Sequence, residues 1–143
     1  MEQISIVYWS QTGNTEAMAL AVAEGVKAAG KEAVLLPVAA ASADELAKEN
    51  TFALGCPAMG AEVLEEGEME PFFTNLEENI KGKKIALFGS FGWGDGQWMR
   101  DWEDRIRDAG AEVLTGEGII CQNTPDEKAL EACRSIGSQM AKL

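Results

Sequence analysis

Six consecutive residues, the SQTGNT stretch that begins at Ser10, have the chemistry of an anion site. They follow an apolar run and precede a helical pattern, so we expect a helix to begin within them. The first backbone N–H groups of a helix have no acceptor within the helix and lie at the positive end of its dipole. Side-chain donors come from Ser10, Thr12, Asn14 and Thr15. Gly13 permits a positive φ and a close approach of the backbone to a ligand. The stretch therefore predicts a site at which neutral donors hold an anion such as a phosphate.

The same stretch lacks the features of the common nucleotide-binding loops. It contains no Lys or Arg and does not match GxxxxGK[ST], which disfavours a nucleoside triphosphatase, and it does not match GxGxxG either. The alternative is a helix cap rich in turn-forming residues. A cap accounts for one Ser or Asn but hardly for six consecutive residues, so we favour the anion site.

A second loop, CPAMGAE, offers groups suited to a flat heterocyclic ring. Five residues separate Cys56 from Glu62, the spacing of a phosphocysteine phosphatase, but a carboxylate stands where that chemistry needs Arg. Met59 is polarizable and suits the face of a ring, Gly60 allows the peptide to change φ and ψ, and Glu62 can accept from a ring N–H. An ordinary loop with a surface Glu is the alternative.

A third loop, SFGWGDG, places Trp93 between Gly92 and Gly94, which leaves it little local packing. We therefore expect Trp93 to be exposed, and exposed aromatic residues of this kind usually stack on a ligand or a partner. Trp98 and Trp102 instead share one face of a predicted helix, which indicates core positions.

Alternating apolar runs and helical patterns position these loops. Strands are predicted at residues 4–9, 33–38, 51–55 and 84–90, with a fifth within 111–121. Helices are predicted over residues 14–29 and over a segment that contains Trp98 and is stopped by Gly110. A last helix is predicted to begin with a capping box at Thr124, which places Pro125 at the first helical position. This alternation predicts an α/β fold with three layers, a doubly wound five-stranded parallel sheet covered on both faces. Ligands bind such sheets beyond the carboxyl ends of the strands, where the three loops lie.

The composition limits the classes of function. The chain has 143 residues, suited to a single domain over 1–143, and 24 acidic against 12 basic residues give a net charge of −12. Such a surface repels nucleic acid and anionic membranes and attracts basic partners, although acidity that merely aids solubility is the alternative. The absence of His excludes Ser-His-Asp and Cys-His catalysis, and the three Cys form no CxxC pair. No signal peptide or membrane helix is indicated, so we expect a cytoplasmic protein.

Taken in strand order, the three loops resemble those of the flavodoxin family, in the short-chain form that lacks an insertion in the fifth strand. The resemblance covers essentially the whole chain, and GWGDGQWMRDWEDR extends it into the following helix. It implies the strand order 2-1-3-4-5 and one tightly but non-covalently bound FMN, with no catalytic residue and no metal. The implied FMN-binding residues are Ser10, Gln11, Thr12, Gly13, Asn14, Thr15, Pro57, Ala58, Met59, Gly60, Ala61, Glu62, Ser90, Phe91, Gly92, Trp93 and Gly94.

The resemblance also implies a role for each loop. The first would hold the 5′-phosphate, and the isoalloxazine ring would lie between Met59 and Trp93. Glu62 would accept from the flavin N3–H, and backbone amides around Gly92 and Trp93 would approach N1 and O2. The carbonyl of Gly60 would turn toward N5 when the semiquinone gains a proton there.

The implied function is electron transfer and not enzymatic catalysis. The protein would be a low-potential one-electron carrier that cycles between oxidised, semiquinone and hydroquinone FMN in place of ferredoxin. Its partners would be basic-surfaced redox enzymes, namely reductase donors and ferredoxin-dependent acceptors, bound transiently by a monomer. An acidic cluster flanks the second loop, and we hypothesise that it lowers the potential of the reduced flavin and docks these partners. The cluster consists of Glu62, Glu65, Glu66, Glu68 and Glu70.

Two other functions fit parts of the pattern. A flavin enzyme that reduces a substrate with a nicotinamide would need a second pocket over the ring, and the sequence shows no dinucleotide loop. A receiver-type signalling domain would need an acidic cluster at the end of the first strand, where Trp9 and Ser10 stand. Gln122 and Asn123, at the end of the last strand, either touch the cofactor or only form the turn.

Overall fold

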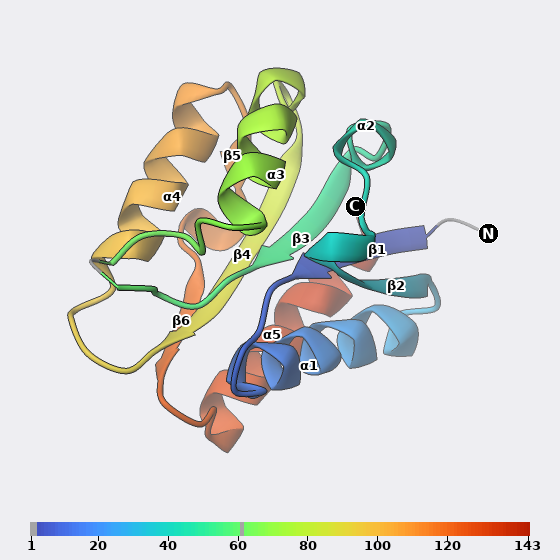
Figure 1. Cartoon of the computed structure of the whole chain (residues 1–143). Coiled ribbons are helices and arrows are strands. Elements are labelled where there is room, and N and C mark those ends of the chain that lie inside the picture. Colours follow the sequence, from blue (N-terminus) through green and yellow to red (C-terminus); the bar gives the residue numbers. More distant parts are fainter. Residues whose placement is uncertain (1–2, 61) are drawn as a thin grey trace.

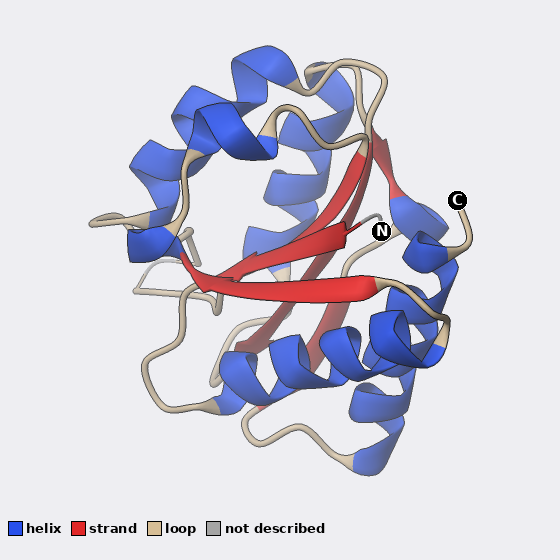
Figure 2. Cartoon of the chain, turned by 90° about the vertical axis from the view of Figure 1, so that its right-hand side faces the viewer, coloured by secondary structure: helices blue, strands red, loops and turns tan. Residues whose placement is uncertain are grey.

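The computed structural model describes residues 3–60 and 62–143, in which the alternating pattern forms a parallel sheet between two layers of helices (Figures 1 and 2). The strands are β1 (Gln3–Tyr8), β2 (Glu32–Pro37), β3 (Thr51–Gly55), β4 (Lys84–Phe91), β5 (Glu112–Val113) and β6 (Ile119–Gln122). The helices are α1 (Asn14–Ala28), α2 (Ala43–Leu46), α3 (Met69–Leu76), α4 (Gln97–Asp108) and α5 (Glu127–Ala141), with 3-10 turns η1 (Val38–Ala40), η2 (Glu77–Asn79) and η3 (Leu114–Gly116). The strand order is β2-β1-β3-β4-β5, and β6 also pairs with β4. The predicted doubly wound α/β fold and its strand order are confirmed.

Each face of the sheet buries its own core, because side chains along a strand alternate between the two faces. On one face α1 and α5 cover Ile6, and Val22 and Ile136 are buried there. On the other face α3 and α4 pack over the sheet and bury Trp98 and Trp102, each 1% exposed. The core positions predicted for these two tryptophans are confirmed. The burial of both faces explains why the strands are continuous apolar runs.

Helices α1 and α5 approach each other backbone to backbone. A Cβ atom on Gly137 would overlap the carbonyl oxygen of Val22, and one on Gly25 would overlap that of Arg134. The two glycines therefore permit a close contact that any side chain would prevent. This contact fixes the position of α1, whose first residues belong to the SQTGNT loop.

The fifth strand differs from its prediction, since it is divided into two short strands. β5 pairs with β4 at Lys84 and Ile85, and β6 pairs with β4 from Phe88 to Phe91. Between them the chain leaves the sheet through η3. Side chains of α4 hold this excursion: the Gly118 N–H donates to Glu103 Oε2 at 2.6 Å, and the Arg107 guanidinium donates to the Gly116 carbonyl. A strand does lie within 111–121 as predicted, but the prediction did not include its division into β5 and β6, between which the chain makes these contacts with α4.

Helix α5 begins later than its sequence indicated. Its N-cap is Asp126, whose carboxylate accepts from the Ala129 N–H at 2.8 Å, and its first residue is Glu127. The predicted capping box at Thr124, with Pro125 at the first helical position, was wrong. A carboxylate is the stronger acceptor at a helix N-terminus, because it combines a hydrogen bond with a favourable interaction with the helix dipole. Among the described residues, none of the helices combines the length and the apolar character that crossing a bilayer demands.

Candidate functional site

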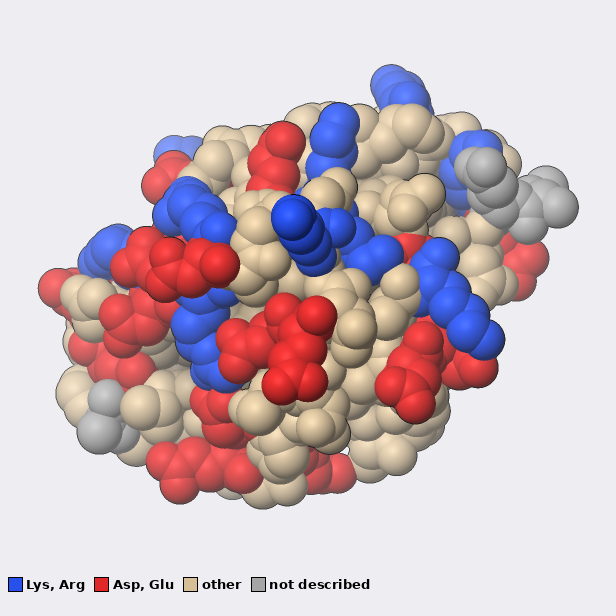
Figure 3. Space-filling model, turned by 90° about the horizontal axis from the view of Figure 1, so that it is seen from above, with Lys and Arg blue, Asp and Glu red and all other residues tan. Residues whose placement is uncertain are grey.

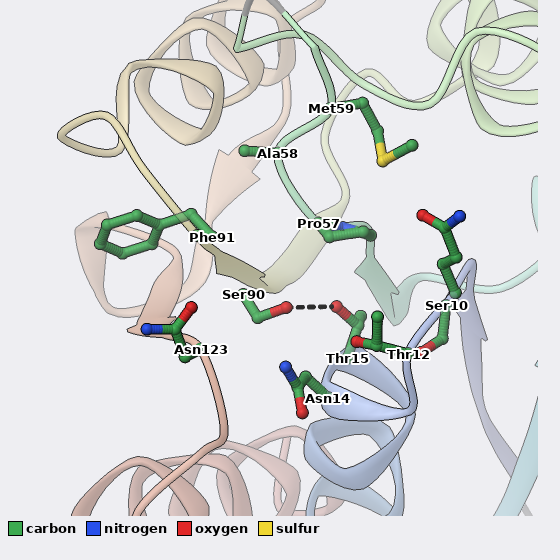
Figure 4. Close-up of a pocket in the computed structure, with 12 residues that line it drawn as sticks. Ser10, Thr12, Asn14, Thr15, Pro57, Ala58, Met59, Ser90, Phe91 and Asn123 are labelled. Carbon is green, nitrogen blue, oxygen red and sulfur yellow. Dashed lines mark hydrogen bonds between the residues drawn. The ribbon is translucent and has the colours of Figure 1, made fainter.

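The loops that follow β1, β3 and β4 meet at one edge of the sheet and surround a pocket of about 200 Å³ (Figure 4). Its lining residues are Ser10, Gln11, Thr12, Asn14, Thr15, Pro57, Ala58, Met59, Ser90, Phe91, Gly92 and Asn123. None of these residues carries a charge. The structure thus brings members of all three predicted loops together, as expected when the carboxyl ends of parallel strands lie side by side.

Ser10 organises the first loop. Its Oγ accepts from the N–H groups of Gly13 and Glu16, both at 3.2 Å, which turns the loop back over the start of α1. Gly13 makes this turn possible with a φ of +94°. The N–H groups of Asn14 and Thr15 have no acceptor among the described residues. Ser10 was predicted to donate to a ligand, and its hydroxyl hydrogen can still do so while its oxygen accepts from the loop.

A pair of buried hydroxyls lies at the centre of the pocket. Thr15 Oγ1 and Ser90 Oγ are 3.2 Å apart and face each other in Figure 4, although their residues are 75 positions apart in the sequence. Thr15 is 1% and Ser90 6% exposed. One hydroxyl hydrogen lies between the two oxygens, so the pair retains one hydrogen to donate elsewhere. The pair therefore joins the start of α1 to the end of β4 and supplies one further donor.

The second loop forms a tight hairpin beside the pocket. The N–H of Met59 donates to the Val63 carbonyl at 3.0 Å, and the reciprocal bond is 3.1 Å. The N–H of Ala58 donates to the Ser90 carbonyl at 3.0 Å, which attaches the loop to the end of β4. Gly60 adopts a φ of +44°, and the predicted site residue Ala61 lies outside the described residues.

Five of the predicted and described site residues lie outside the pocket lining, namely Gly13, Gly60, Glu62, Trp93 and Gly94. Trp93 is 65% exposed, as expected from its glycine neighbours. Glu62 Oε1 accepts from the Gln97 N–H at the start of α4, at 3.1 Å, and its carboxylate lies against Gly94. Phe91, by contrast, is among the lining residues, and its ring packs against Trp98 with ring centroids 5.7 Å apart.

Comparison with known proteins identifies the family. The sequence profile of the flavodoxin family matches residues 6–137. The chain is 49% identical over 140 residues to the flavodoxin of Clostridium beijerinckii, an alignment that covers 98% of this chain and 100% of that protein. The chain belongs to the flavodoxin family. The flavodoxin of Megasphaera elsdenii is 47% identical over 139 residues, 97% of this chain and 98% of that protein.

The solved structures agree with this assignment. The solution structure of two-electron reduced Megasphaera elsdenii flavodoxin matches the fold with a TM-score of 0.87 and 46% identity, over 98% of this chain and 99% of that one. Flavodoxins are electron-transfer proteins that use FMN and exchange electrons with redox partners. The interpretation of this chain as an FMN-dependent electron carrier and not an enzyme is confirmed. The findings give no support to the nicotinamide-dependent enzyme or to the receiver domain.

The end of β6 adds a pocket residue that sequence reasoning left undecided. Asn123 lines the flavodoxin pocket with a φ of +60°, and its N–H donates to the Phe91 carbonyl at 2.8 Å. Gln122 lies outside the lining, but its Nε2 donates to the Gly92 carbonyl at 3.3 Å. Asn tolerates the left-handed region better than most residues, so an Asn directly after a strand was the available signal.

Cys56, the residue that opens the second loop, has no reactive role in this arrangement. Burial raises the pKa of its thiol to about 12, and its Sγ accepts from the Glu65 N–H at 3.4 Å. Its carbonyl accepts from Trp98 Nε1 at 3.0 Å. The residue therefore anchors the loop to α4, in agreement with the rejection of a phosphocysteine mechanism.

The acidic cluster divides into structural and exposed carboxylates. Glu65 accepts from three backbone N–H groups at the start of α3, at 2.7 to 2.9 Å. Glu70 forms a bidentate pair with Arg105 at 2.8 and 2.9 Å. Glu66 and Glu68 are exposed, and Glu68 accepts from Trp9 Nε1 at 3.0 Å. Only part of the predicted cluster is thus positioned to meet a partner.

Proposed function

We propose that the pocket holds the phosphate and ribityl chain of FMN, while the loops at its mouth hold the ring. The observation that supports this most directly is the donor set, in which two unpaired helix N–H groups and neutral side chains converge where no charged residue lines the cavity. The pocket volume of about 200 Å³ is below the ~300–1,000 Å³ of most ligand clefts, which suits the phosphate end of FMN with the ring outside.

The chemistry of these donors fits a phosphate. The N–H groups of Asn14 and Thr15 lie at the positive end of the α1 dipole, and the hydroxyl pair of Thr15 and Ser90 adds the hydrogen that it does not use internally. Hydrogen bonds to a charged acceptor are about twice as strong as neutral ones. We therefore assign the first loop to the 5′-phosphate, with Thr12 as a further side-chain donor.

The ring would be held by Met59 of the lining together with Trp93 and Glu62, which lie outside it. Met59 would lie against one face and Trp93, already extended into solvent, against the other. Glu62 would accept from the N3–H, and backbone N–H groups near Gly92 and Trp93 would approach N1 and O2. FMN, when bound, supplies a ring that exchanges electrons one at a time. Met59 and Trp93 would exclude water from the two faces of the ring and leave its edge accessible to a partner.

The charge distribution supports a low potential and basic partners. The carboxylates that follow the second loop, among them Glu62, Glu66 and Glu68, would disfavour the addition of negative charge to a ring bound there. Lys81, Lys83 and Lys84 lie at the opposite edge of the sheet, where β4 begins. Figure 3 shows this opposite end from above, with Lys and Arg gathered among Asp and Glu. The net charge of −12 would attract positive surfaces, and the lysines at the start of β4 would favour approach by the pocket end.

We accordingly propose a low-potential carrier that serves in place of ferredoxin. It would be a single-domain, cytoplasmic monomer that meets basic-surfaced reductases and ferredoxin-dependent acceptors transiently. A visible spectrum of the full chain with added FMN, followed by anaerobic reductive titration, tests the proposal. We expect stoichiometric FMN binding, reduction in two one-electron steps, and affinity for riboflavin at least about 100-fold weaker, since it lacks the phosphate. Equal affinity for FMN and riboflavin would contradict the assignment of the first loop.

A further inference from the structure

Helix α4 begins without a side-chain cap of its own. Its N-cap residue is Gly96, with a φ of +91°, and makes no side-chain hydrogen bond. The acceptor for the first helical N–H, that of Gln97, is Glu62 Oε1 at 3.1 Å, 35 residues earlier in the chain. A carboxylate at this position gains both a hydrogen bond and a favourable interaction with the dipole of the 12-residue helix.

Gly94 provides the space for this contact. A Cβ atom at Gly94 would lie 2.6 Å from Glu62 Cδ and Oε1 and 2.9 Å from Oε2. Gly94 also has a φ of +88°, which residues with a side chain rarely adopt. Gly30 has a similar φ of +91°, but nothing lies within 4 Å of its Cβ position. The two glycines share their backbone conformation and differ in whether a side chain would meet Glu62.

We infer that Gly94 and the N-terminus of α4 form a holder for the Glu62 carboxylate, which fixes one oxygen so that the other can accept from the N–H of the flavin ring. This inference rests on the proposed function. A carboxylate has about four lone-pair sites on its two oxygens, and Oε2 has no donor among the described residues. Glu62 has a φ of +57°, which is unusual for a residue with a side chain.

The holder gives α4 a part in ring binding that does not require it to touch the ring. Because the Glu62 side chain is fixed before the ring arrives, less conformational freedom is lost on binding. The positive end of α4 also offsets part of the carboxylate charge beside the ring. The Gln97 backbone and Gly94 are therefore positioning groups, which act through Glu62.

The first test uses the full chain without FMN. The backbone amide resonance of Gln97 should shift in Glu62→Ala and should shift in the same way in Gly94→Ala. In Glu62→Gln, which keeps an acceptor oxygen, this resonance should remain near its original position. Gly30→Ala is the matched control for alanine at this φ and should leave the Gln97 resonance unchanged. An unchanged Gln97 resonance in Glu62→Ala would overturn the inference without reference to FMN.

The second test is a double-mutant cycle on FMN affinity. Gly94→Ala should weaken FMN binding about tenfold when Glu62 is present, the loss expected when one charge-assisted hydrogen bond is displaced. In the Glu62→Ala background the same change should alter the affinity less than about threefold, because backbone strain is then its remaining effect. Additive effects would overturn the holder. Failure of every variant and of the unaltered chain to bind FMN would refute the proposed function instead, while the resonance test still decides the holder.

Discussion

Replacement of Thr15 by Val tests whether the buried hydroxyl pair serves the ligand or only the fold. Val keeps the branched shape of Thr, so the change removes a hydroxyl without leaving a cavity. It also leaves Ser90 Oγ, in a residue that is 6% exposed, without its partner 3.2 Å away. An unsatisfied buried polar group costs about 1–3 kcal/mol, which we expect as a loss in the free energy of unfolding of the FMN-free chain.

The effect on FMN binding depends on which hydroxyl donates outward. Thr15 lies in the first turn of α1, beside the N–H groups that we assign to the phosphate, so we expect Thr15 Oγ1 to supply the outward hydrogen. A hydrogen bond to a charged group contributes about 1.5–3 kcal/mol, so FMN should bind about 10- to 150-fold more weakly to Thr15→Val. Riboflavin lacks the phosphate, and its affinity should change by less than about threefold. The two affinities are measured by titrating the chain into each flavin and following the quenching of flavin fluorescence.

A matched variant separates the two roles of the pair. Ser90→Ala removes the other hydroxyl but leaves Thr15 its hydrogen, so FMN affinity should fall less than in Thr15→Val, and the double variant should lose about as much FMN affinity as Thr15→Val alone. Equal weakening of FMN and riboflavin would show that the pair shapes the pocket without contacting the phosphate. A loss of stability with unchanged FMN affinity would refute the assignment of these hydroxyls to the ligand.

Two further predictions concern charge. The hydrogen bonds from Arg105 lower the pKa of Glu70 below 4.5, so the pair adds stability that is present above this value and is lost as the pH falls through the lowered pKa of the folded state. The urea concentration at the midpoint of unfolding should therefore decrease as the pH falls below about 4.5, and it should decrease less steeply in Glu70→Gln. Identical dependences of this midpoint on pH in the two proteins would contradict this account. The second prediction concerns docking. The combined change Glu66→Gln and Glu68→Gln should slow electron transfer to a basic haem protein at low salt and should reduce the dependence of the rate on salt. The control Glu32→Gln, at the start of β2, should change neither quantity. Equal effects of the paired and control changes would show that net charge, and not this surface, guides the encounter.

The sheet and its two layers were predictable because the strands are apolar runs bounded by turn residues and the helices have regular apolar faces. These signals are local and strong. The division between β5 and β6 was not predictable, because it depends on Glu103 and Arg107 of α4, which contact backbone groups of η3 from another part of the chain. A sequence pattern indicates that a segment prefers the strand conformation. It does not indicate that side chains of a neighbouring helix will form hydrogen bonds with the backbone of that segment in place of the adjacent strand.

The location of the site was predictable for a topological reason, since loops at the carboxyl ends of parallel strands must meet. The directions of its side chains were not. Ser10 accepts from its own loop, Glu62 reaches α4, and Asn123 enters the pocket. Each depends on a backbone with positive φ, at Gly13 and at Glu62 and Asn123 themselves. One residue with a positive φ changes the direction of the chain that follows it. The residue types therefore indicated the chemistry of the site, whereas the directions of the side chains depend on the tertiary structure.

The two halves of the pocket belong to opposite layers of the molecule. The phosphate-side donors begin α1, which lies with α5 on one face of the sheet, whereas the second and third loops lead into α3 and α4 on the other (Figure 1). A ligand bound by both halves of the pocket would contact both helical layers and stabilise their packing on the sheet. Opening of either layer would then have to release the same ligand, so both openings would become rarer by the same factor, 1 + [L]/Kd. Amide hydrogen exchange in α1 and in α4 would then slow by the same factor when FMN binds, and FMN would act as a structural part of the fold.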